Sequence, residues 1–90
     1  MGHMSKRYHP RAKHHSWCIR TLVKRDGAIC AICAKPFKCK GDITLDHRVA
    51  RSKGGGDNIE NLQLAHEPCN QDKGDMSQAE WDEFQAVKAA

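Results

Sequence analysis

Four polar side chains have the types and the spacing that hydrolysis requires. Asp46 and His47 are adjacent and directly follow the apolar run Ile43-Thr44-Leu45, while Asn61 and Asn70 come later in the chain. An imidazole can take a proton from water near neutral pH, because its ordinary pKa lies there. A carboxylate and an amide oxygen suit a hard divalent cation, which can neutralise charge on a phosphate and on the leaving oxygen. We therefore expect metal-assisted phosphodiester cleavage, with His47 as the general base and with Asp46 and Asn70 as ligands of the catalytic ion.

The placement of these residues fits separate tasks. Neighbouring side chains on a strand point to opposite faces, so Asp46 can face the ion while His47 faces the attacking water. Asn61 lies where the long loop after the strand returns. Its amide can hydrogen-bond the loop backbone and hold His47 in orientation. Each residue alone also has an ordinary structural explanation, such as a surface ion pair or a turn cap, and it is their coincidence with a second pattern that favours catalysis.

The second pattern is a pair of metal-ligand spacings. Cys30-x2-Cys33 is followed, after 32 intervening residues, by His66-x2-Cys69. Thiolates and imidazoles are zinc ligands, and structural zinc takes four of them in a tetrahedron. We expect this ion to supply the stability that the small core of such a short chain lacks. Two alternatives stay open at this point: Cys39 in place of His66 as the fourth ligand, and the first two cysteines as buried apolar residues only.

Periodicity and capping signals indicate the elements that position these residues. They predict a helix from Trp17 to about Lys24, capped by Ser16 and stopped by Asp26-Gly27, and a strand at 43–47. A long loop over 48–60 contains the run Gly54-Gly55-Gly56. A short helix from Pro68 to Lys73 ends at Gly74, and the capping box at 77–80 opens a final helix with Trp81, Phe84 and Val87 on one stripe. Ile59, Leu62 and Leu64 are expected only to anchor the loop.

Composition and charge limit the class of protein. The chain has 90 residues, a net charge of +4 and five cysteines, so we expect one small domain. An odd cysteine count and no secretory signal favour a reducing compartment, and no apolar run approaches a membrane span. The first three residues resemble an expression-vector remnant. Residues 1–15 are expected to form a flexible basic arm, and 16–90 the functional domain, with its core at 17–75 and a C-terminal helix at 77–89.

Basic residues near the site indicate a polyanionic partner. The stretch from Ser5 to Arg25 contains seven Lys and Arg residues and no acid. Such a segment can contact a nucleic-acid backbone, with binding that falls as salt rises. The same contact with phosphate is expected of Arg48, Arg51, Lys53 and Lys73. The ordinary alternative for each of these side chains is solvated charge.

Taken together, the motifs resemble the HNH nuclease family. The residues that carry the resemblance are Arg25-Asp26-Gly27, Asp46-His47, Arg51-Ser52-Lys53-Gly54-Gly55, Glu60-Asn61-Leu62, Cys69-Asn70 and Lys73-Gly74. The resemblance covers about residues 17–75. It implies an α+β fold: a small zinc-stapled ββα-metal (His-Me finger) domain with flanking N- and C-terminal helices. It also implies DNA cleavage with Mg2+ or Mn2+, His47 as base, Asn61 as the central asparagine, and Asp46 and Asn70 as metal ligands.

The chain departs from the family pattern at one position. His66 stands where the second zinc pair usually begins with Cys, and Asn70 is a common variant of the last histidine, which favours hard ions. A zinc-stabilised nucleic-acid-binding module without activity is the competing interpretation. Small HNH proteins resemble phage products, so a phage packaging motor (terminase) is a possible partner. One active site favours nicking by a monomer, a homodimer could cut both strands, and we expect a bacterial or phage-infected cytoplasm.

Overall fold

A computed structural model describes residues 12–89 and shows the expected α+β architecture. Its helices and strands are α1 (Ala12–Asp26), β1 (Ile43–His47), β2 (Leu62–His66), α2 (Glu67–Lys73) and α3 (Gln78–Ala89). Short 3-10 turns, η1 (Lys40–Asp42), η2 (Arg51–Lys53) and η3 (Ile59–Asn61), interrupt the loops. Within the described range, no helix has both the length and the apolar composition that a membrane crossing demands.

A two-stranded antiparallel sheet is the centre of the fold. β1 pairs with β2 so that Ile43 lies opposite His66 and His47 opposite Leu62. β1 has the predicted bounds. The residue pattern alone did not predict β2, with the sequence LQLAH, because Leu62 and Leu64 were expected only to anchor the preceding loop. The antiparallel ladder with β1 supplies the backbone hydrogen bonds that make this short segment a strand, so it is a tertiary effect.

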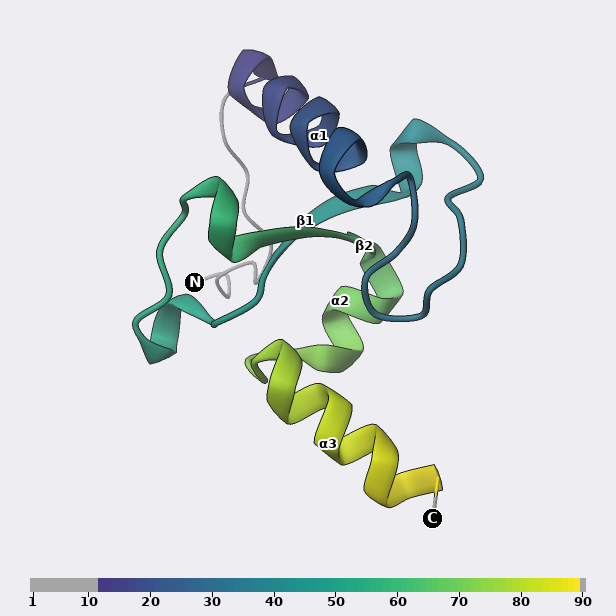
Figure 1. The fold of residues 1–90 in the computed structure, drawn as a ribbon, viewed down its shortest axis with the longest axis vertical. Coiled ribbons are helices and arrows are strands. Elements are labelled where there is room, and N and C mark those ends of the chain that lie inside the picture. The colour runs from purple at the N-terminus through teal and green to yellow at the C-terminus, as the bar shows by residue number, and fades with distance from the viewer. Residues whose placement is uncertain (1–11, 90) are drawn as a thin grey trace, which may run out of the picture.

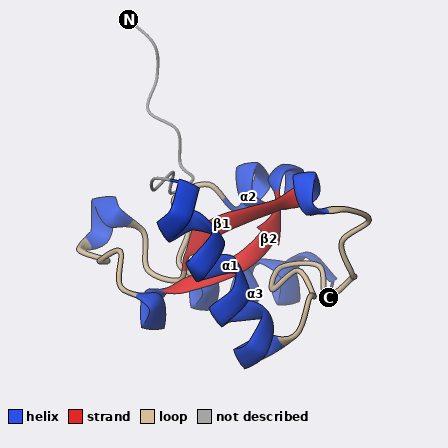
Figure 2. Ribbon diagram, turned by 90° about the horizontal axis from the view of Figure 1, so that it is seen from above, coloured by secondary structure: helices blue, strands red, loops and turns tan. Residues whose placement is uncertain are grey.

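The two faces of the sheet have opposite character. α1 covers one face and α2 the other (Figures 1 and 2). On the α1 side the apolar core consists of Cys18, Leu22, Leu45, Leu62 and Leu64, each no more than 1% exposed. Among the described residues, the buried polar ones are Thr44, Asp46, His47, Gln63, Asn70 and Lys73. Several of them line the contact between β1 and α2, so the same hairpin builds both the core and a buried polar site.

α1 begins earlier than expected. It starts at Ala12, so Ser16 is inside the helix and is not its N-cap, and residues 12–15 of the expected arm are helical. No Gly or Pro interrupts residues 12–16, and the His14 ring stacks on Trp17 at 5.5 Å. Such i to i+3 side-chain contacts stabilise an additional helical turn. The remainder of the expected arm, residues 1–11, lies outside the described residues.

The C-terminal elements match the predicted signals. Gly74 terminates α2 with φ 58°, and Pro68 lies in its first turn. The capping box is formed: the Glu80 amide donates to Ser77 Oγ at 3.1 Å, and the Ser77 amide donates to Glu80 Oε1 at 2.8 Å. α3 has no buried residue, and Phe84 and Val87 are 45% and 71% exposed. The predicted apolar stripe therefore packs only partly.

Candidate catalytic site and metal centre

Four metal-ligating side chains converge where the loop after α1 meets the start of α2. These are Cys30, Cys33, His66 and Cys69, and their ligand atoms all lie within 4.8 Å of one another. His66 Nδ1 is 3.4 Å from Cys33 Sγ and 4.0 Å from Cys69 Sγ. Around a tetrahedral zinc, ligand atoms at ordinary bond lengths are about 3.5 to 3.8 Å apart. The cluster therefore has the dimensions of a Cys3His zinc site, with Nδ1 as the ligating nitrogen.

The structure selects His66 over the alternative ligand. Cys39 is exposed and does not belong to the cluster. The ring of Phe37 packs against the His66 ring at 4.6 Å, which fixes the orientation of the imidazole. Cys18, expected in the core, is indeed buried, and burial raises the pKa of its thiol. A free thiol in that place is unsuited to metal binding.

Cys30 is prepared for the ionised state that a metal ligand needs. Burial alone would raise the pKa of this thiol, but the backbone amides of Cys33 and His66 donate to its sulfur at 3.5 and 3.4 Å. Together with the Ile32 backbone and the His66 side chain, these bonds lower the pKa of Cys30 to about 7. Burial, together with the neighbouring charge of Cys30, raises the pKa of Cys69 to about 12. A cation at the centre of the cluster would relieve this repulsion between thiolates.

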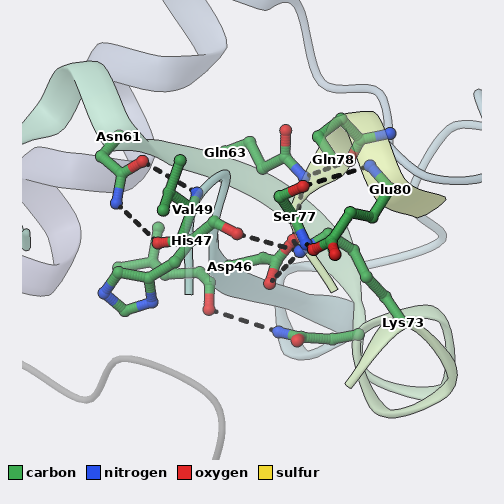
Figure 3. A network of polar contacts seen from close by, with 12 residues as sticks. Asp46, His47, Val49, Asn61, Gln63, Lys73, Ser77, Gln78 and Glu80 are labelled. Atoms are coloured by element: carbon green, nitrogen blue, oxygen red, sulfur yellow. Dashed lines mark hydrogen bonds and ion pairs between the residues drawn. The ribbon is translucent and has the colours of Figure 1, made fainter. Parts of the chain in front are cut away.

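Asp46 occupies the polar face between β1 and α2. Its Oδ2 accepts from Gln63 Nε2 at 2.8 Å and lies 3.1 Å from Lys73 Nζ (Figure 3). Oδ1 lies 3.4 Å from the same ammonium, and Asp46 is only 2% exposed. Gln63 Nε2 also donates to Gln78 Oε1 at 2.7 Å, which ties the start of α3 to the site. The carboxylate is therefore held firmly in place by strand, helix and amide.

Asn70 presents an unpaired oxygen on the same face. Its Nδ2 donates to Thr44 Oγ1 and to the Leu45 carbonyl, both at 3.3 Å, so its Oδ1 must point the other way. Within the described part of the chain, Oδ1 is the one buried side-chain atom that has no hydrogen-bond partner. A buried acceptor without a partner is costly, and a hard cation would satisfy it. Asn70 and Asp46 therefore offer the donor types that a divalent ion takes, and both are buried between β1 and α2.

His47 faces away from Asp46. Its imidazole and the Asp46 carboxylate extend in different directions from neighbouring positions (Figure 3), as expected for a strand. His47 Nε2 lies 2.7 Å from Asp57 Oδ1, and the ring is almost buried. Arg51 Nε lies 3.6 Å from the same carboxylate oxygen. Nε2 therefore carries a proton that it donates to Asp57, and in the neutral ring the lone pair is on Nδ1.

Asn61 braces the loop that follows His47 and carries Asp57. Its Oδ1 accepts from the Val49 amide at 3.0 Å, and its Nδ2 donates to the carbonyls of Val49 at 3.0 Å and Gly56 at 2.8 Å. The expectation that Asn61 hydrogen-bonds the loop backbone is therefore confirmed. The glycine run is closely packed at this point. A Cβ on Gly55 would lie 1.8 Å from the Val49 carbonyl oxygen.

The basic side chains divide into two groups. Arg48, Arg51 and Lys53 are exposed by 45%, 65% and 43%, on the loop beside His47, and Lys53 pairs with Glu80. Lys73 does not match its expected role as a phosphate contact. Its side chain is 1% exposed and its Nζ donates to the His47 carbonyl at 2.9 Å as well as to Asp46. The buried carboxylate attracts this ammonium into the interior and away from the surface.

Comparison with known families agrees with this geometry. A family model described as HNH endonuclease matches residues 30–76, more than half of the chain. The chain belongs to the HNH endonuclease family. A search among curated proteins found no match. The matched segment of this HNH domain runs from the first cysteine pair through β1, β2 and α2, so it includes the Cys3His cluster and the whole polar face.

Two residues of the HNH site escaped prediction from the sequence. Asp57 is ten positions after His47 in a loop whose path has no fixed spacing, so nothing in the chain indicated its contact with the imidazole. Gln63 gave a signal that could have been used. A glutamine between Leu62 and Leu64 is unusual for a loop anchor, and it indicates an inward-facing polar group once the segment is recognised as a strand.

Proposed function

We propose that this HNH protein is a DNA endonuclease that hydrolyses phosphodiester bonds with His47 as the general base. Asp46 and Asn70 would hold a divalent ion, Mg2+ or Mn2+, and the Cys3His cluster would hold a structural zinc. The observation that carries the proposal is the unpaired, buried Oδ1 of Asn70 on the face that also holds the Asp46 carboxylate. A module that only binds nucleic acid has no use for that pair beside a buried imidazole.

The residues divide the work as follows. When bound, the divalent ion would supply charge neutralisation at the scissile phosphate and the leaving oxygen. Asp57 holds the His47 ring through Nε2, which places the basic lone pair on Nδ1, and that nitrogen takes the proton of the attacking water. Asn61 keeps the intervening loop in register by its bonds to Val49 and Gly56.

Positively charged side chains on the loop beside His47 would hold the DNA backbone. Arg48 and Arg51 present exposed guanidinium groups on the loop that follows β1. Contacts of this kind position a phosphate backbone without reading sequence. One such site per chain makes nicking the expected product for a monomer, and cleavage of both strands would require a dimer. We also propose that the protein acts with a phage packaging motor, and nicking measured with and without that motor tests this partnership.

Cleavage of supercoiled plasmid tests the proposal. Zinc-loaded protein is incubated with Mg2+, Mn2+, Ni2+ or added Zn2+, beside the His47→Ala variant, and nicked and linear forms are separated on a gel. We expect nicked circles with Mg2+ or Mn2+ and a loss of at least about 100-fold for His47→Ala, within the range of general-base contributions. Unchanged zinc content and circular dichroism show that the variant is folded. DNA binding without cleavage in every ion, or full activity of His47→Ala, would reject the mechanism.

A further inference from the structure

The most unusual group in the polar site is the ammonium of Lys73. Lysine is almost never fully buried unless it is paired, and here the side chain is 1% exposed. Its Nζ lies 3.1 Å from Asp46 Oδ2 and 3.4 Å from Oδ1, so it faces both oxygens of the carboxylate. A third contact, 2.9 Å to the His47 carbonyl, completes the surroundings of the charge.

A divalent cation held by Asp46 would need the carboxylate oxygens that this ion pair already uses. One oxygen of Asp46 also accepts from Gln63, and that amide is fixed by its own bond to Gln78. The ammonium is the more mobile of the two partners, because lysine has a flexible four-carbon stem and residue 73 is the last of α2. Two cations sharing one carboxylate repel each other strongly in a buried site. The ammonium must therefore leave Asp46 when the ion arrives.

We propose that Lys73 is a resident cation that competes with the divalent ion for Asp46 and so sets the affinity of the HNH site for that ion. This inference rests on the proposed role of Asp46 and Asn70 as ion ligands. Without the ion, the ammonium compensates the buried carboxylate, which would otherwise be left without a counter-charge. On displacement, Lys73 can keep its bond to the His47 carbonyl, so it does not lose every partner at once. The unpaired Asn70 Oδ1, one helical turn away on α2, is satisfied only when the ion binds.

Binding of Mn2+ to zinc-loaded protein tests the competition without measuring cleavage. Free Mn2+ is followed by electron paramagnetic resonance for the wild type, Lys73→Met, Lys88→Met and Asp46→Asn. Methionine retains an unbranched apolar stem of similar length and removes the charge. Lys88 is an exposed lysine in the last turn of α3, so its replacement controls for net charge alone. We expect the Kd of Lys73→Met to fall by about tenfold or more, equivalent to about 1.4 kcal/mol.

The controls separate the possible outcomes. Lys88→Met should bind Mn2+ within about twofold of the wild type, and Asp46→Asn should lose the site. Mn2+ should also raise the Tm of Lys73→Met by more than that of the wild type, because the unpaired Asp46 carboxylate gains a partner. If Lys73→Met is poorly folded, Lys73→Gln replaces it. A wild-type Kd for the Lys73 variants together with loss of binding in Asp46→Asn would overturn the competition alone. Unchanged binding in Asp46→Asn would overturn the ion assignment and the competition with it.

Discussion

Replacing Gly55 with alanine tests how the loop beside His47 is held. An added Cβ would lie 1.8 Å from the Val49 carbonyl oxygen and 2.9 Å from Asn61 Nδ2. Both distances are shorter than any that real Cβ atoms adopt, and the nearer contact is with backbone, which cannot rotate away. The Val49 backbone and the Asn61 amide must therefore separate. Gly55→Ala therefore disrupts the packing of the loop against Val49 and Asn61.

The loss of stability in Gly55→Ala follows from the hydrogen bonds that hold Asn61 against the loop. Asn61 makes three hydrogen bonds across the gap, to the Val49 amide, the Val49 carbonyl and the Gly56 carbonyl. A typical hydrogen bond contributes about 1 kcal/mol net, and overpacking adds about 1 to 3 kcal/mol. Since the loop can relax in part, we expect Gly55→Ala to lower the free energy of unfolding by about 2 to 4 kcal/mol. That is a large share of the stability of so small a domain.

Urea unfolding of zinc-loaded protein, followed by circular dichroism, measures this loss. A slope of about 1 kcal/mol/M converts it to a midpoint shift of about 2 M or more. The matched control is Gly41→Ala, because a Cβ there meets only Cys39 Sγ, at an ordinary 3.7 Å. We expect that variant to stay within about 0.5 kcal/mol of the wild type. Equal stability of the two variants would show that Asn61 does not brace the loop in the way described.

The remaining predictions concern the general base, the exposed arginines beside it and the zinc ligands. Because the Asp57 carboxylate orients His47, Asp57→Ala should lower kcat for plasmid nicking by about 10-fold to 100-fold and leave DNA affinity unchanged. Asp57→Glu should recover part of the lost kcat. A change in DNA affinity without a change in kcat would contradict this role of Asp57. Arg48→Ala should weaken DNA binding evenly across sequences and reduce the slope of log affinity against log salt concentration by about 1. Fluorescence anisotropy at several salt concentrations measures this slope, and an unchanged slope excludes a phosphate contact by Arg48. His66→Ala should lose zinc while Cys39→Ser keeps it, measured as metal content per chain; zinc retained in the first variant and lost in the second would reverse the ligand assignment.

The sequence predicts well those features that depend on local chemistry. The Cys and His spacings identify the cluster, the capping box gives the start of α3, and the apolar run before Asp46 gives β1 with its bounds. The capping box, the apolar run and each of the two ligand pairs lie within a few residues. The start of α1 was placed too late, because Ser16 is a good cap by type and the stacking of His14 on Trp17 that favours the longer helix is visible only in three dimensions.

The other features that could not be predicted depend on contacts between segments that lie farther apart in the chain. Lys73 is buried because it pairs with the Asp46 carboxylate, which lies 27 positions earlier in the chain. The residue type of Lys73 alone indicates an exposed surface charge. β2 exists because β1 supplies its ladder, and Asp57 reaches His47 because the glycine-rich loop folds back on Asn61. In each case the position of a polar side chain is decided by a fold that local pattern does not specify.

The two proposed metal sites depend on each other through α2. This helix has only seven residues, too few to be stable alone, and its N-cap is His66. Cys69 of the Cys3His cluster is followed directly by Asn70 of the polar face, so the two proposed sites share one helical turn. From the other end, Lys73 ties the same helix to β1 through Asp46 and the His47 carbonyl. A structural zinc would therefore fix the N-terminus of α2, and with it the position of Asn70, while Lys73 holds the C-terminus through the His47 carbonyl, the bond that it can keep when the ion is bound. Loss of the zinc should then impair binding of the catalytic ion even though the two ions have no ligand in common.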